Sequence, residues 1–155
     1  MARNLKMPIF NEYQDRELLM NTLALEVSKE LQNILKVKDR VTLAVPGGLT
    51  PKPFFHRLSV IELDWKRVLV IPTDERFVPE TSALSNIGLI RAVLLQNYAR
   101  EAKILSFFKP NYSVEELAVH ISDELQTFFT DRYLHFGNGI RYAYGFNFFR
   151  RGSIK

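Results

Sequence analysis

Three short apolar runs, each separated from the next by a helical pattern, most constrain how this chain can fold. The runs are VTLAV at 41–45, RVLVIPT at 67–73 and AKILSFF at 102–108. Each is apolar and compact enough to form a buried strand. Because strands alternate with helices along the chain, we predict an α/β fold with a mainly parallel, Rossmann-like sheet flanked by helices.

The segments between these runs carry helix signals. Apolar residues recur at helical spacing, and Gly and Pro are absent from the longest segment. Ser85 or Asn86 can cap one helix and Ser113 another, and Pro51 suits a first helical turn. Residues 8–11 are a candidate for a short first strand. Four helices are predicted, over residues 15–36, 52–59, 86–95 and 114–129.

Composition excludes several classes of protein. The chain has 155 residues, 46% hydrophobic and 25% charged, as expected for a globular domain with a substantial core. It has no cysteine, which excludes disulfides, thiolate zinc sites and a cysteine nucleophile. Its apolar runs are too short for a membrane span or a signal-peptide core, so we expect a cytoplasmic protein with no membrane partner.

The net charge of +4 is concentrated at one end of the chain. Residues 1–130 hold 16 Lys and Arg against 16 Asp and Glu, whereas residues 131–155 hold five against one. We interpret 1–130 as part of a single α/β domain and 131–155 as an atypical basic, aromatic tail. A nucleic-acid-binding module that uses this tail is one alternative, and the neutral body argues against it. No feature indicates the oligomeric state.

The segment after the first predicted strand, PGGLTP at 46–51, suits anion binding. Gly47 and Gly48 let the backbone approach a ligand closely, and Thr50 adds a hydroxyl donor. The helix that follows presents its N-terminus, which favours an anion. The pattern predicts a phosphate cradle, with a plain strand-to-helix turn as the alternative. It matches neither a Walker loop nor GxGxxG.

A second polar loop follows the next strand. Asp74, Glu75 and Arg76 stand together there, and they can supply a base and a fork-shaped anion clamp. A solvated loop with a local ion pair is the alternative. Ligands of open α/β sheets bind beyond the carboxyl ends of strands, where both loops are predicted to lie.

Four short motifs, taken in order, resemble one enzyme family. They are GGLTP (47–51), Asp64-Trp65, DERFVP (74–79) and Ser85-Asn86. This set resembles the 6-phosphogluconolactonases of the glucosamine/galactosamine-6-phosphate isomerase superfamily. The related deaminases typically carry DEY where this chain has DER. The resemblance implies hydrolysis of 6-phosphoglucono-δ-lactone to 6-phosphogluconate in the pentose phosphate pathway, with a phosphorylated sugar lactone as partner and no metal or cofactor.

The resemblance also implies roles for individual residues. It assigns catalytic roles to Asp74 and Arg76, of which Asp74 would orient the sugar or water. It assigns substrate or phosphate binding to Gly47, Gly48, Leu49, Thr50, Arg76 and Asn86. Two positions depart from the family pattern, since Leu49 replaces a serine and Pro46 replaces a small residue. Leu49 removes a hydroxyl donor and Pro46 removes an N–H.

The family's general base is a histidine in a later motif, GMGxDGHTAS, which this chain lacks. Its histidines are His56, His120 and His135. The first two fall on predicted helices and are expected to be surface or packing residues, and His135 lies in the tail. The activity of this chain is therefore in question, and the fold is expected to be incomplete at the C-terminus. An inactive sugar-phosphate-binding fragment or pseudogene product is a further alternative.

The tail can be interpreted as a frameshifted form of the missing motif. Residues 142–147 can be encoded TAT GCA TAC GGC TTC AAT, which one base later gives Met-His-Thr-Ala-Ser. A genuine basic, aromatic segment is the alternative. The frameshift hypothesis places an insertion or deletion near the codon for Asp131 or Arg132, and an intact frame in the gene would reject it.

Overall fold

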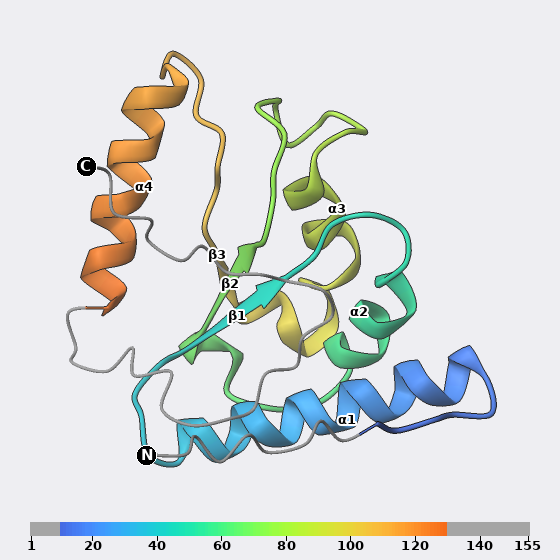
Figure 1. The fold of residues 1–155 in the computed structure, drawn as a ribbon. Helices are drawn as coiled ribbons and strands as arrows, with labels where there is room; N and C mark the ends of the chain where they lie inside the picture. Colours follow the sequence, from blue (N-terminus) through green and yellow to red (C-terminus); the bar gives the residue numbers. More distant parts are fainter. Residues whose placement is uncertain (1–9, 130–155) are drawn as a thin grey trace, which may run out of the picture. The chain divides into compact units, whose positions relative to one another are not determined.

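A computed structural model describes residues 10–129, in which three parallel strands form the sheet in the order β1-β2-β3 (Figure 1). The strands are β1 (Val41–Val45), β2 (Val68–Pro72) and β3 (Lys103–Ile104). Val41 is paired with Val68, and Leu69 with Lys103. The chain divides into two compact units, Met1–Ile121 and Ser122–Lys155, and the whole sheet belongs to the first. This arrangement confirms the predicted parallel α/β fold.

Helices connect the strands, as parallel pairing requires. α2 (Lys52–Ser59) lies between β1 and β2 in the chain, and α3 (Asn86–Val93) lies between β2 and β3. Right-handed crossovers in this strand order place both helices on one face of the sheet. α2 contacts α3, and it also contacts the preceding helix, α1 (Arg16–Leu35).

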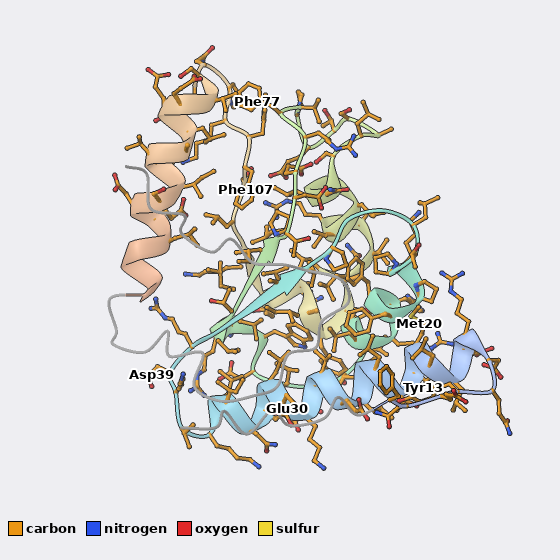
Figure 2. All side chains as sticks on the ribbon, in the orientation of Figure 1. Tyr13, Met20, Glu30, Asp39, Phe77 and Phe107 are labelled. Atoms are coloured by element: carbon orange, nitrogen blue, oxygen red, sulfur yellow. The ribbon has the colours of Figure 1, made fainter. Side chains whose placement is uncertain are left out.

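Apolar side chains of these three helices and of the sheet form the core. Met20 points from α1 toward α2 (Figure 2), and it is 6% exposed. Burial of each large apolar side chain stabilises the fold by roughly 1.5–3 kcal/mol. The largest fully buried side chains of the described residues include Trp65, Phe55, Leu58, Ile87, Ile90 and Leu94.

The ends of the helices follow from local side-chain chemistry. Asp15 caps α1 by accepting a hydrogen bond from Leu18 N at 2.8 Å. The last helix, α4 (Val114–Phe129), begins with a capping box in which Ser113 and Glu116 bond to each other's backbone N–H. Both helices confirm the predicted segments.

The predicted ends of two strands and one helix were wrong by a few residues. The third strand ends at Ile104 rather than 108, because the Ser106 hydroxyl donates to Phe108 O at 3.0 Å and turns the chain. The second strand starts after a 3₁₀ helix, η1 (Trp65–Arg67), and α3 ends at Val93 ahead of a second one, η2 (Asn97–Glu101).

The N-terminal strand prediction and the tail fall largely outside the described residues. Phe10 and Asn11 are not in a strand, and residues 8–9 are not described. The boundary at 130 and the frameshift in 131–155 likewise lie outside the described residues and stay predictions.

Candidate functional site

Two loops leave the carboxyl edge of the sheet side by side. One follows Val45 into α2 and the other follows Pro72 into α3 (Figure 1). Val45 and Pro72 are paired in register, and Thr73 N donates to Val45 O at 2.9 Å. The topology therefore starts both predicted site loops at neighbouring points.

The two positions of the first loop that hold glycine require it for different structural reasons. A Cβ added at Gly47 would overlap with the side-chain amide of Asn86, so this position needs close approach. Gly48 has φ of 82°, in the left-handed region, with open space where a Cβ would lie. A side chain at Gly47 would displace Asn86, whereas one at Gly48 would strain the backbone.

Asn86 joins the first loop to the second. Its Nδ2 donates to Asp74 O at 3.0 Å and to Asp74 Oδ2 at 3.1 Å. Its amide also packs on the backbone of Gly47. Three residues that sequence reasoning selected are thus brought together by one side chain.

Glu75 belongs to the acid–acid–arginine trio named from the sequence, but no individual role was assigned to it there. Its carboxylate accepts hydrogen bonds from Asn86 N at 2.8 Å, Ile87 N at 2.7 Å and Ser85 Oγ at 3.0 Å. Arg76 N also donates to it, at 2.7 Å. Glu75 therefore caps α3 from outside the helix. A local pattern could not have found it, because the acid stands eleven positions before Asn86 in the chain.

Ser85 completes this cap. Its hydroxyl accepts from Gly88 N at 3.0 Å, which confirms Ser85 as the N-cap of α3. Together Ser85 and Glu75 satisfy three consecutive N–H groups in the first turn. Such groups otherwise lack partners at a helix start.

Arg76 is exposed, and it is not tied to the glycine loop by any hydrogen bond. Its guanidinium has no hydrogen bond or ion pair with any residue of the described segment 10–129. The alternative of a local ion pair with its neighbouring acids is therefore not observed within this segment. The group keeps its charge and its donors for an anion.

The remaining residues of the first loop face solvent. Leu49 is 71% exposed, and Thr50 is also exposed. Arg16, the first residue of α1, donates from Nη2 to Thr50 O at 2.9 Å. This bond anchors the loop from a helix that sequence reasoning did not connect with the site.

The outer part of the second loop is held by Glu80 and Phe77. Arg91 Nε donates to Glu80 Oε2 at 2.6 Å. Burial raises the pKa of the Glu80 carboxyl, but hydrogen bonds from Arg91 and Ser106 and the charge of Arg91 outweigh burial and lower it below 4.5. Phe77 (Figure 2) packs its ring 5.3 Å from that of Phe108. The loop is thus attached to α3 and to the segment after β3.

Among residues 10–129, the hydrogen bonds of Asp74, Arg76 and Asn86 involve neither described histidine. His56 is exposed on α2, and His120 lies beside Lys109 and the ring of Tyr112. Within residues 10–129, no three His, Asp or Glu side chains gather as a metal site. The helices described there include none that is long and apolar enough to cross a membrane.

Known proteins match this chain over most of its length. Residues 14–139 match the family described as glucosamine-6-phosphate isomerases/6-phosphogluconolactonase. A 6-phosphogluconolactonase of Mesorhizobium japonicum is 38% identical over 109 residues, 70% of this chain and 46% of that protein. One of Pseudomonas aeruginosa is 42% identical over 96 residues, 62% of this chain and 40% of that protein. The chain thus spans less than half the length of these curated relatives.

Solved structures show the same fold. The crystal structure of a 6-phosphogluconolactonase from Shewanella baltica superposes with a TM-score of 0.74 at 31% identity, covering 80% of this chain and 53% of that one. The crystal structure of the 6-phosphogluconolactonase from Thermotoga maritima superposes with a TM-score of 0.60 at 25% identity, covering 70% of this chain and 50% of that one. By sequence pattern and by fold, the chain belongs to the glucosamine-6-phosphate isomerase/6-phosphogluconolactonase family.

Proposed function

We propose that the carboxyl edge of the sheet binds a phosphorylated sugar lactone, and that the chain serves hydrolysis of 6-phosphoglucono-δ-lactone to 6-phosphogluconate. One observation carries this proposal. Asn86 packs on Gly47 and donates to Asp74, so both loops that the resemblance assigns to substrate meet at one point. The relatives named 6-phosphogluconolactonase support the choice of substrate.

The glycine loop suits the phosphoryl group. Open space at Gly48 lets ligand oxygens approach the backbone. No described side chain caps the N-terminus of α2 behind the loop, and its first turn holds no acidic residue, so its partial positive charge is available to an anion. Thr50 offers a hydroxyl donor, whereas Leu49 contributes only its backbone N–H.

Asp74 and Arg76 suit the polar groups of the sugar. Asp74 is held by Asn86 Nδ2 but remains exposed, so its carboxylate can accept from sugar hydroxyls or from a water molecule. The exposed guanidinium of Arg76 can bind anionic oxygens in a bidentate manner. These roles bind and orient the substrate.

Hydrolysis also needs a base that activates water beside the lactone carbonyl and donors for the developing oxyanion. Among the described residues, the hydrogen bonds of Asp74, Arg76 and Asn86 involve no histidine. The described part therefore supplies the binding and positioning half of the reaction. A cytoplasmic location belongs to this proposal, because charged sugar phosphates do not cross a bilayer unaided.

The test is to measure 6-phosphogluconate binding and lactone hydrolysis by the chain and by Arg76→Ala. We expect Arg76→Ala to weaken binding by roughly tenfold, because a charge-assisted pair with the ligand is lost. Arg100→Ala is the matched control, since Arg100 is an exposed arginine whose nearest acid is Glu101 at 3.6 Å. Equal affinities of Arg76→Ala and the chain would contradict the proposal.

Comparison of the two readouts separates the alternatives. Hydrolysis above the spontaneous rate that disappears in Arg76→Ala would assign the reaction to this chain. Product binding without hydrolysis would assign a sugar-phosphate-binding role. The nucleic-acid alternative instead predicts salt-dependent binding to single strands that is lost when residues 131–155 are deleted.

A further inference from the structure

We infer that Glu75 is a specificity-determining and positioning residue, which fills the anion site of α3 with a carboxylate of the protein itself. The inference rests on the proposed function and deepens it. With the α3 site occupied, the phosphoryl group of the substrate is confined to the glycine loop. Arg76, next to Glu75 in the chain, has no guanidinium partner among residues 10–129 and stays available to the ligand.

The contacts of Glu75 are those of a bound oxyanion. Oε1 accepts from Asn86 N and Arg76 N, and Oε2 accepts from Ile87 N and Ser85 Oγ, all between 2.7 and 3.0 Å. Two successive N–H groups at a helix start, with a hydroxyl beside them, are the donors that phosphate or carboxylate ligands use. The site is therefore already filled.

The two helices that follow the loops differ in this respect. α2 and α3 each have eight residues, and neither has an acid in its first turn. The N-cap of α2, Pro51, makes no side-chain hydrogen bond, whereas α3 has both Ser85 and the carboxylate of Glu75. Within the described residues 10–129, the N-terminus of α3 is therefore occupied by a carboxylate and that of α2 is not.

The position of Glu75 also determines the surroundings of Arg76. Each oxygen of the carboxylate already accepts two hydrogen bonds, and none of the donors is the guanidinium of Arg76. Asp74, on the other side, is held by Asn86, whose backbone N–H Glu75 also binds. The carboxylate of Glu75 therefore binds the N-terminus of α3, while the side chains of Asp74 and Arg76 remain exposed to solvent.

The test uses isotope-labelled chain and inorganic phosphate as the probe, with backbone amide shifts read by NMR. In the unmodified chain, we expect phosphate to shift Gly47 and Gly48 and to leave Asn86 and Ile87 unchanged. In Glu75→Ala, we expect Asn86 and Ile87 to shift with phosphate as well, and formate to raise the melting temperature more than in the unmodified chain.

Two outcomes would overturn the inference. One is a phosphate response of Asn86 and Ile87 in the unmodified chain, and the other is no response in Glu75→Ala. If Glu75→Ala does not fold in plain buffer, formate should restore its far-UV circular dichroism. Failure of that rescue, together with a normally folded Glu75→Gln, would reject an anion requirement.

A binding readout tests the role in specificity. We expect Glu75→Gln, which keeps the shape but removes the charge, to weaken 6-phosphogluconate binding roughly tenfold. Glu75→Asp should recover part of the affinity, and Glu101→Gln, at an exposed surface pair, should leave affinity unchanged. Unchanged affinity in Glu75→Gln would contradict the role. If the unmodified chain binds no 6-phosphogluconate, the proposed function fails, while the phosphate experiment still decides the inference.

Discussion

At the scale of single residues, Gly47 and Asn86 are the pair that joins the two loops of the candidate site. Asn86 can reach Asp74 only because Gly47 has no side chain in its way. Gly48, the neighbouring glycine, has no such contact and is required for its positive φ instead. The two glycines should therefore respond differently to substitution.

We predict that Gly47→Ala destabilises the chain by about 1–3 kcal/mol, because its methyl group would displace the Asn86 amide. Asn86→Ala should cost about 1 kcal/mol for its two hydrogen bonds to Asp74. The double variant should be more stable than the sum of both losses predicts, because the clash is absent. Urea unfolding of all four proteins measures this coupling.

Gly48→Ala combined with Asn86→Ala is the control for that cycle. Gly48 has no atom near the position of a Cβ, so its effect and that of Asn86 should add. Strict additivity in the Gly47 cycle would mean that the contact between the two loops is not present in solution.

The role of Glu75 shows where residue-level reasoning from sequence ends. The sequence placed an acid-acid-arginine trio at a strand end, and the position of the trio agrees with the structure. Which acid faces the helix depends on how the loop folds back over ten residues onto α3. That arrangement is tertiary, and no propensity or cap rule indicates it.

At the scale of elements, the predictable features are those that depend on local patterns. The long helix α1, strand β1 and the caps Ser85 and Ser113 follow from spacing and side-chain chemistry, whereas Asp15, predicted as part of the helix, is the N-cap of α1. β3 is shorter than its apolar run because Ser106 competes with the ladder for backbone partners. An apolar run alone could not show where pairing stops.

The bond between Glu80 and Arg91 of α3 should make the titration of Glu80 visible in the stability of the chain. Arg91 Nε donates to the Glu80 carboxylate at 2.6 Å, and the pKa of Glu80 is lowered as a result. Since the folded-state pKa lies below the ordinary 4.5, the ionised carboxylate contributes its full stability above that pH. The contribution is lost as the pH falls through the lowered pKa.

The free energy of unfolding of Glu80→Gln, measured against pH, checks this prediction. The variant should be less stable than the unmodified chain near neutral pH, and the difference should shrink in acid. Arg91→Ala, which removes the stronger partner, should show the same reduced pH dependence. If the difference in unfolding free energy between Glu80→Gln and the unmodified chain stays constant from neutral to acid pH, the bond between Glu80 and Arg91 does not form in solution.

At the scale of the whole molecule, topology places the site, and no single motif does. Parallel pairing of β1 with β2 aligns Val45 with Pro72, so loops far apart in sequence begin as neighbours. α1 adds Arg16, which anchors Thr50 from a helix that the sequence did not connect with this loop. The meeting of the two loops was predictable from the strand order, but these anchors were not.

The central claim is that the glycine loop and the Asp74–Arg76 loop bind one phosphorylated sugar together. The most direct measurement is an NMR titration of the labelled chain with 6-phosphogluconate, with gluconate as the ligand that lacks phosphate. We predict that the amides of Gly48, Thr50 and Arg76 shift together with a single dissociation constant, and that gluconate binds much more weakly. Shifts confined to one loop, or equal responses to both ligands, would contradict the claim.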